Sequence, residues 1–228
     1  MKYTKLGTSD LNVSRIVLGC MRIADKPLER TERLLEAAMG AGVNMFDHAD
    51  IYGGGESERL FGLALKNTGI AREKIVVQSK CGIRKGMFDF SKQHILEAAE
   101  GSLKRLGTEY LDALLLHRPD ALMEPDEIFA AFDELYRSGK VRQFGVSNFS
   151  VSQTRLLEGG RYPIAANQLQ FSLMHAGMVD EGLNVNMMKG ESVERGGEIL
   201  DYCRLKRITV QAWSPLNFGM FEGIFVGN

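Results

Sequence analysis

Residues Leu111–Leu116 read LDALLL, a short run in which every residue but one is apolar. A strand of this composition is typical of a parallel sheet that is covered on both faces. Similar apolar runs recur on either side of it and alternate with stretches of helical period, which predicts seven strands. The predicted strands span residues 14–19, 43–47, 74–79, 110–117, 142–146, 165–171 and 208–213. Because the intervals are too regular for separate domains, we expect a single domain over residues 1–228.

The stretches between these strands have the pattern of amphipathic helices, with apolar side chains on one stripe. Gly107 and Gly139 stand where two of these helices should end. The predicted helices span residues 28–41, 58–66, 92–106, 126–138, 152–158 and 197–206. The opening segment, residues 3–13, carries Gly7 between apolar flanks and predicts a hairpin that caps one end of the domain.

Two folds cover both faces of a parallel sheet: an open, doubly wound sheet and a TIM barrel. The sequence has no GxGxxG pattern after its first strand and no GxxxxGK[ST] phosphate loop. Polar residues gather instead at the C-terminal ends of most strands, as they do in a TIM barrel. We therefore predict an α/β (β/α)8 TIM barrel, of which the chain covers about seven strands. Residues 174–196 interrupt the alternation of strands and helices and are expected to form an inserted loop near the functional site.

Composition narrows the class of partner. Lys and Arg total 28 against 29 Asp and Glu, so no positive field is available to hold nucleic acid or an anionic membrane. The sequence has neither a signal peptide pattern nor an apolar run of membrane-spanning length, and we expect a cytoplasmic protein. The cysteines, Cys20, Cys81 and Cys203, form no CxxC pair, which argues against disulfides and structural zinc. A small uncharged molecule is the expected substrate.

Four residues with acid, base or cation chemistry follow three successive predicted strands: Asp47 and Tyr52 after the second, Lys80 after the third and His117 after the fourth. A phenol with a pKa of about 10 gives up its proton readily only when a cation stabilises the phenolate. Lys80 can be that cation, and Asp47 can keep it charged and oriented. His117 can hold a substrate carbonyl by a hydrogen bond. The set predicts reduction of a carbonyl group without a metal.

Several short motifs occur in an order that is more specific than any one of them. They are KLGTS (5–9), VLG (17–19), NMFD (44–47), YG (52–53), Lys80, LLH (115–117), GVSNF (145–149), NQ (167–168) and WSPL (213–216). With these motifs the chain resembles the aldo-keto reductases from Leu6 to Leu216. The resemblance implies NAD(P)H-dependent reduction of an aldehyde or ketone, with Tyr52 as proton donor, Lys80 and Asp47 tuning it, and His117 placing the carbonyl.

The resemblance also implies a nicotinamide site, with NADP(H) favoured over NAD(H). Its predicted residues are Gly19, Cys20, Met21, Asp47, Ser147, Asn148, Gln168, Trp213, Ser214, Pro215 and Leu216. Residues 147 and 148 end an apolar strand and residue 168 lies inside another, so these polar side chains need partners that a carboxamide can supply. The indole of Trp213 offers a flat surface for the nicotinamide ring.

Other interpretations remain open. His48, Asp50 and His117 near one rim are also compatible with a metal-dependent hydrolase, although residues 47 and 48 should point to opposite faces of a strand. A relative that binds the cofactor and acts only as an interaction subunit would keep the same fold. The glycines at 53–55 predict a turn that leads to a helix N-cap at Ser57.

The end of the sequence carries one more expectation. After Leu216 no eighth strand follows, and in similar proteins the residues that choose between NADP and NAD lie beyond this point. An incomplete barrel would leave two unpaired strand edges. We therefore expect a longer natural chain or closure by a partner, which leaves a homo-oligomer open.

Overall fold

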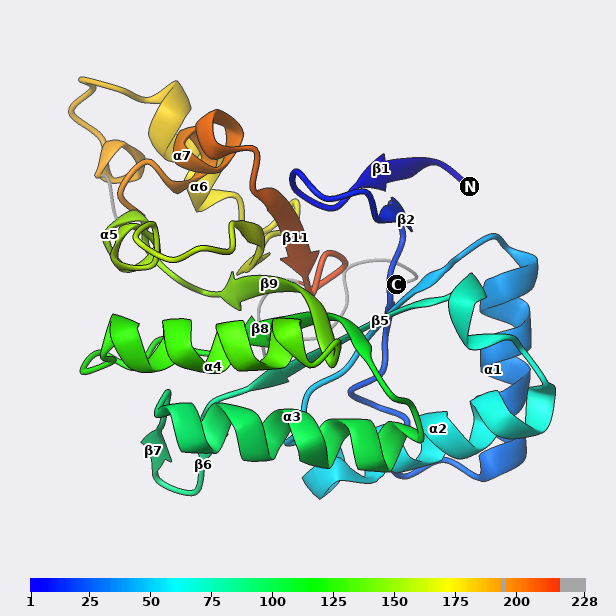
Figure 1. The fold of residues 1–228 in the computed structure, drawn as a ribbon. Helices are drawn as coiled ribbons and strands as arrows, with labels where there is room; N and C mark the ends of the chain where they lie inside the picture. The colour runs from blue at the N-terminus through cyan, green and yellow to red at the C-terminus, as the bar shows by residue number, and fades with distance from the viewer. Residues whose placement is uncertain (194–195, 218–228) are drawn as a thin grey trace.

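The computed structural model describes residues 1–193 and 196–217, and its centre is a sheet of seven parallel strands in the order β11-β10-β9-β8-β5-β4-β3 (Figure 1). The strands are β3 (Leu18–Gly19), β4 (Met45–Asp47), β5 (Val76–Cys81), β8 (Leu111–Leu116), β9 (Val141–Ser147), β10 (Ile164–Gln170) and β11 (Thr209–Trp213). Each corresponds to one predicted strand. The α/β parallel fold is therefore confirmed.

The sheet is curled, because side chains from strands that are far apart in the strand order meet inside it. Gln78 on β5 and Gln211 on β11 exchange two hydrogen bonds of 2.9 and 3.0 Å between their amides. Gln168 on β10 donates to Asp47 on β4 at 3.1 Å. An open sheet cannot bring these strands face to face, so these contacts identify barrel-like curvature.

Helices cover the outer face of the sheet (Figure 1). They are α1 (Leu28–Gly40), α2 (Glu56–Thr68), α3 (Lys92–Leu106), α4 (Pro125–Arg137), α5 (Val151–Leu156) and α7 (Ile199–Lys206). A further helix, α6 (Gly177–Leu183), contacts α7 and the 3-10 turn η3 (Gly190–Ser192), and the other 3-10 turns are η1 (Tyr52–Gly55) and η2 (Arg72–Lys74). The segment 174–196, which we expected to form an inserted loop, contains α6 and η3 and is therefore partly helical. No helix in the described ranges is long and apolar enough to cross a membrane.

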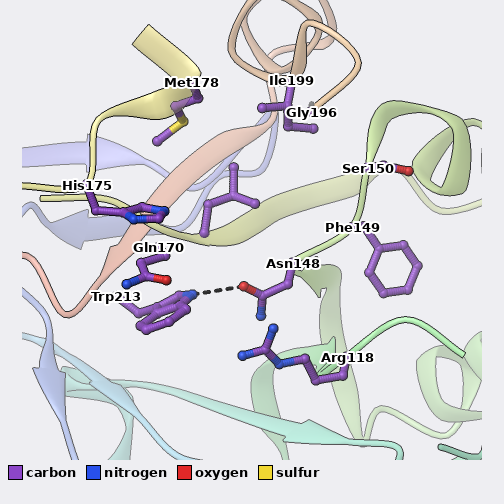
Figure 2. A pocket seen from close by; sticks show the side chains of 11 residues that line it. Arg118, Asn148, Phe149, Ser150, Gln170, His175, Met178, Gly196, Ile199 and Trp213 are labelled. Atoms are coloured by element: carbon purple, nitrogen blue, oxygen red, sulfur yellow. Dashed lines mark hydrogen bonds between the residues drawn. The ribbon is translucent and has the colours of Figure 1, made fainter. Parts of the chain in front are cut away.

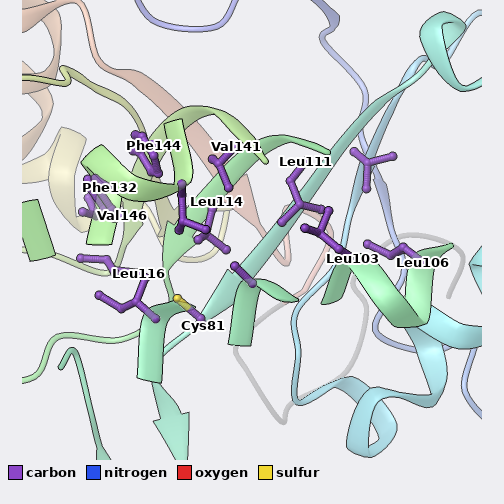
Figure 3. Packing of buried hydrophobic residues seen from close by; sticks show 14 of the residues in the cluster. Cys81, Leu103, Leu106, Leu111, Leu114, Leu116, Phe132, Val141, Phe144 and Val146 are labelled. Carbon is purple, nitrogen blue, oxygen red and sulfur yellow. The ribbon is translucent and has the colours of Figure 1, made fainter. Parts of the chain in front are cut away.

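The apolar run that predicted the fold packs on two sides, as expected for a covered strand. Leu114 and Leu116 belong to the outer core between β8 and the helices, which Figure 3 shows with Leu103 of α3 and Phe132 of α4. The alternating residue Leu115 belongs to a second core inside the curled sheet. Since successive strand residues point to opposite faces, both positions must be apolar.

An N-terminal hairpin covers the inner core at the end of the sheet where the strands begin. It consists of β1 (Tyr3–Lys5) and β2 (Asn12–Ser14), which pair antiparallel, and a second small hairpin joins β6 (Ile83–Arg84) and β7 (Met87–Phe88). Gly7 lies so close to the sheet that an added Cβ would come within 2.6 Å of the Ala165 carbonyl oxygen. Its amide donates to Thr209 at 2.7 Å. Residues 165 and 209 lie at the beginning of their strands, so the hairpin caps the N-terminal end as predicted.

The glycine turn before α2 differs from the prediction. The helix begins at Glu56 after Gly55, which has a φ of 93°, and no side chain caps it. Ser57 is buried inside the first turn, and its hydroxyl has no hydrogen-bond partner among the described residues. Three consecutive glycines with positive φ reverse the chain tightly enough that the helix starts without a hydroxyl cap.

Candidate active site

The four predicted catalytic residues lie at the C-terminal end of the central strands. Asp47 is the last residue of β4, Lys80 lies near the end of β5, and His117 follows β8 directly. Tyr52 begins η1, the turn that follows β4. Parallel strands end at one rim of the sheet, and the fold thus brings these four residues together.

Lys80 is the centre of this group. Its ammonium donates to a carboxylate oxygen of Asp47 at 2.7 Å, to the Tyr52 hydroxyl at 3.0 Å and to the His48 carbonyl oxygen at 2.8 Å. The Lys80 side chain is 0% exposed. All three donors of the ammonium are therefore used, and one points at a phenol that can itself lose a proton.

The electrostatics keep Lys80 charged and Tyr52 protonated. Burial alone would lower the pKa of Lys80, but the charges of Asp47 and Tyr52 and their hydrogen bonds outweigh it and raise this pKa above its usual value. Burial raises the pKa of Tyr52, and the opposing effect of Lys80 does not cancel it. The ammonium therefore acts on the phenol in the expected direction, while the net shift keeps the proton on Tyr52 at neutral pH.

His117 lies beside the phenol with its ring edge-on to Tyr52, the ring centres 5.8 Å apart. Burial, with a contribution from Lys80, lowers the pKa of His117 from 6.5 to about 3. The imidazole is therefore neutral near pH 7. Its buried Nδ1 has no hydrogen-bond partner in the described part of the chain. A neutral imidazole of this kind can donate one hydrogen bond to a substrate oxygen.

Hydrogen bonds from glutamine side chains inside the curled sheet hold the Asp47 carboxylate in place. The carboxylate oxygen that does not face Lys80 accepts from Gln78 at 2.6 Å and from Gln168 at 3.1 Å. Gln211 bridges both glutamines. The sequence prediction missed Gln78 and Gln211, although each is a polar residue inside an apolar strand, the same signal that singled out Gln168.

The residues predicted to bind the nicotinamide carboxamide are connected to one another. Ser147 donates to the Gln168 carbonyl oxygen at 3.0 Å, and Asn148 donates to the Ser147 hydroxyl at 2.8 Å. The Trp213 indole donates to the Asn148 amide oxygen at 3.0 Å (Figure 2). Asn148 has a φ of 60° and leaves the strand direction at this point. Hydroxyl and amide groups of this kind suit a carboxamide, which both donates and accepts.

The other predicted cofactor residues occupy the same rim at two places. Gly19 pairs in register with Asp47, and a Cβ added there would meet no atom within 4 Å. Neither packing nor backbone conformation therefore requires glycine, and the open space suits the approach of a ligand to the backbone. Cys20 is buried, with a raised thiol pKa caused by burial, whereas Met21 is 53% exposed.

The second place is the turn after β11. Ser214 has a φ of 52° and is half-buried, and the two residues that follow it, Pro215 and Leu216, are exposed. Trp213 is half-buried at the end of the strand. The donor set, the open backbone at Gly19 and the indole together fit a nicotinamide.

A cavity of about 480 Å³ opens beside Trp213 and Asn148 (Figure 2). Arg118, Gln170, His175, Met178 and Ile199 also line it. Tyr52 and Lys80 are not part of its wall, so this space adjoins the proton-donor group without containing it. Three residues of the segment 174–196, His175, Met178 and Gly196, line this cavity, so part of the segment lies beside the predicted cofactor residues Asn148 and Trp213.

The three residues of the metal interpretation do not converge. The ring of His48 contacts Phe61 of α2 on the outer side of the sheet, with ring centres 4.5 Å apart. Burial lowers its pKa to about 3, and burial together with Glu58 raises the pKa of Asp50 to about 7. Within residues 1–193 and 196–217 no group of three or more His, Cys, Asp or Glu side chains is arranged to hold a metal ion.

Comparison with known proteins agrees with this geometry. The sequence model described as "Aldo/keto reductase family" matches residues 15–226. The chain is 40% identical to the uncharacterized oxidoreductase YcsN of Bacillus subtilis, covering 92% of this chain and 69% of that protein. It is 34% identical to a 6-dehydroglucose reductase of Agrobacterium fabrum, covering 98% and 75%. The solved glycerol dehydrogenase of Gluconobacter oxydans superposes with a TM-score of 0.76 at 27% identity, covering 92% of this chain and 62% of that one.

Proposed function

The chain belongs to the aldo/keto reductase family of oxidoreductases, which use nicotinamide cofactors and act on carbonyl groups, and from this premise we propose that it reduces an aldehyde or a ketone to an alcohol. One observation carries the proposal: the buried ammonium of Lys80 donates to both Asp47 and the Tyr52 phenol, at 2.7 and 3.0 Å. That arrangement joins a proton donor to the cation that stabilises its conjugate base.

Each residue of the group then has a defined role. Tyr52 donates its proton to the carbonyl oxygen as negative charge develops there. Lys80 stabilises the phenolate that remains, and Asp47 keeps Lys80 charged and fixed in direction. His117, neutral because burial lowers its pKa, orients the carbonyl by a hydrogen bond to the same oxygen. These steps account for the proton that the alcohol gains.

The cofactor supplies the hydride that the carbonyl carbon accepts. We propose that Ser147, Asn148 and Gln168 bind its carboxamide and that Trp213 packs against its ring. In the structure the Trp213 indole N–H donates to the side-chain oxygen of Asn148 at 3.0 Å. This hydrogen bond would break when the Asn148 amide binds the carboxamide. The backbone at Gly19, Cys20 and Met21 and the turn Ser214, Pro215 and Leu216 would flank it. NADP(H) is the proposed form in preference to NAD(H).

The relatives suggest which carbonyl compounds to try first. The relatives compared above include one named for 6-dehydroglucose and one for glycerol. We therefore propose a panel that includes polyhydroxylated aldehydes and ketones beside simple aromatic aldehydes.

The test is Tyr52→Phe, which removes one hydroxyl and keeps the ring. We expect kcat to fall by about 10²–10⁴-fold, the usual size of a lost general acid, while the affinity for NADPH stays within a few-fold of wild type. Steady-state kinetics across the panel and a fluorescence titration with NADPH and NADH measure both. The matched control is Tyr136→Phe, which changes an exposed tyrosine on α4 and should leave both unchanged.

Two outcomes would overturn the proposal. Equal turnover in Tyr52→Phe would remove Tyr52 from its role as proton donor. A wild-type protein that binds NADPH but reduces nothing in the panel would instead support the interaction subunit, which shares the fold and the cofactor site.

A further inference from the structure

The cavity beside Trp213 has walls of two kinds. Met178 and Ile199 form an apolar side, while Arg118 faces it from the opposite edge (Figure 2). No Asp or Glu side chain lines it in the part of the chain that the structure describes. The cavity therefore combines apolar side chains with the polar groups of Asn148, Gln170 and His175, and Arg118 brings a positive charge to one edge.

Among the described residues, Arg118 lacks the carboxylate partner that the other half-buried arginines, Arg72 and Arg105, have. Its guanidinium lies 5.9 Å from the centre of the Trp213 ring, and no described residue accepts a hydrogen bond from it or pairs with its charge. By contrast, Arg72 pairs with Asp112 at 2.7 Å and Arg105 pairs with Glu58 at 2.7 Å. The N–H donors of Arg118 are therefore free to bind an acceptor on a ligand that enters the cavity.

The position of Arg118 relates it to the proposed chemistry. It follows His117 directly, and His117 is the residue proposed to hold the carbonyl oxygen. The five N–H groups of a guanidinium form a planar fork that matches a carboxylate or a phosphate in two parallel hydrogen bonds. A ligand that fills this space thus presents an anion to Arg118 and an apolar portion to the opposite wall.

We infer that the substrate is a carbonyl compound that carries a carboxylate or a phosphate, and that Arg118 binds this anionic group. The inference rests on the proposed function and specifies its substrate class. Met178 and Ile199 hold the apolar portion between the anion and the cavity wall. The protein then prefers anionic substrates, because a neutral aldehyde leaves the positive charge of Arg118 without a partner.

Pairs of substrates that share a carbonyl group and differ only in the anionic group measure the effect of the charge alone. We compare 4-carboxybenzaldehyde with its methyl ester, and succinic semialdehyde with its methyl ester; glyceraldehyde 3-phosphate against glyceraldehyde asks the same question for a phosphate. The wild type should have the higher kcat/KM for the charged member of at least one pair. Arg118→Met should lower that value by about 10–100-fold, mainly through KM, and leave the neutral member unchanged, since a charge-assisted pair contributes about this much. Arg118→Lys should retain part of the preference.

Arg161→Met is the matched control, because this exposed arginine precedes β10 at the opposite end of the sheet. It should change nothing. Equal selectivity in wild type and Arg118→Met would overturn the inference. So would an Arg118→Met variant whose KM rises for NADPH rather than for the anionic substrate, because Arg118 would then bind the cofactor.

A binding experiment distinguishes failure of this inference from failure of the proposed function. Trp213 is the only tryptophan in the sequence, so intrinsic fluorescence reports on the cavity itself. Benzoate, which has the anion but no reducible carbonyl, should quench the wild type and leave Arg118→Met unchanged. If no aldehyde is reduced but this difference holds, the anion site stands without the reductase. If benzoate quenches both proteins equally, the anion site is wrong whatever the activity.

Discussion

Strand β5 contacts one ion pair on each of its two faces. Lys80 points into the curled sheet and pairs with Asp47 at 2.7 Å. The preceding residue, Ser79, points outward and donates to Glu58 of α2, which pairs with Arg105 of α3 at 2.7 Å. Lys80 and Glu58 are both 0% exposed. The two pairs have the same length, but their second partners differ in burial, since Asp47 is 11% exposed and Arg105 is 31% exposed.

They differ in their third partner. The inner ammonium also donates to the Tyr52 phenol at 3.0 Å, a group that can lose a proton to a ligand. The outer carboxylate accepts from the Ser79 hydroxyl at 2.5 Å, which does not titrate, and the Arg105 guanidinium is held further by Ser102 at 3.3 Å. A buried ion pair is therefore weak support for function by itself. It becomes chemically useful when it donates directly to a titratable group at the rim of the sheet, as Lys80 does to Tyr52.

The largest expected difference between the two pairs is in turnover. Lys80→Met removes the cation that stabilises the Tyr52 phenolate, and we expect kcat/KM to fall by about 10³-fold with a favourable aldehyde. The pKa of Tyr52 should rise further, because Lys80 is the group that lowers it. A profile of kcat/KM against pH measures both effects, since a purely structural loss would not move the alkaline limb.

The matched variant on the other face is Glu58→Gln, which should leave kcat/KM within a few-fold of wild type. If both variants lost activity in proportion to the folded protein that remains, the inner pair would be structural like the outer one, and the comparison would fail.

The second expected effect is in stability, and it tests the outer pair by itself. Glu58→Gln keeps an acceptor for Ser79 but removes the charge opposite Arg105, so we expect a loss of about 2–3 kcal/mol in the free energy of unfolding, the usual value of a hydrogen bond to a charged group. Urea denaturation followed by circular dichroism measures this. Glu56→Gln, on the exposed side of the same helix, is the control and should produce no measurable change. An equally small change in Glu58→Gln would show that Arg105 is satisfied by water.

The sequence predicts the strands and the meeting of the four rim residues because both depend on local pattern. An apolar run such as Leu111–Leu116 must be buried on both faces, and parallel strands must end at one rim. The opposite directions of Asp47 and His48 follow from the same strand alternation, and the structure agrees. These features need only the period of the chain, so one sequence is enough.

Contacts between distant segments are not predictable in this way. Glu58 and Arg105 are 47 residues apart, and Gln78 and Gln211 are 133 apart. Their pairing depends on which helices are adjacent and how far the sheet curls. Helix α6 was missed for a different reason: it is only 7 residues long and contains two glycines, so its pattern is too short to stand out from a loop. The roles of the rim residues stay predictions until the variants are measured.

The smallest expected effect contrasts two histidines, His48 on the outer face and His117 on the inner one. Burial lowers the pKa of each from 6.5 to about 3, so both are neutral in the folded protein. The unfolded chain takes up these protons as the pH falls below 6.5, which stabilises the unfolded state. The stability that each histidine contributes is therefore present above pH 6.5 and lost as the pH falls toward 3. Between pH 6.5 and 4.5 we expect a loss of about 2 kcal/mol per histidine.

The two positions can be separated by substitution. His48→Leu should flatten the decline in unfolding free energy between pH 6.5 and 4.5 by about half of the histidine contribution, without a change in the pH dependence of kcat, because its ring contacts Phe61 rather than the rim. His117→Asn should flatten the decline as well but also lower kcat, since the shorter amide cannot take the position of the imidazole that is proposed to hold the carbonyl. Urea titrations at five pH values and kinetics at the same values provide both readings. If His48→Leu altered the kinetics as much as His117→Asn, the outer face would take part in the chemistry, and the division between the two faces of the sheet would be wrong.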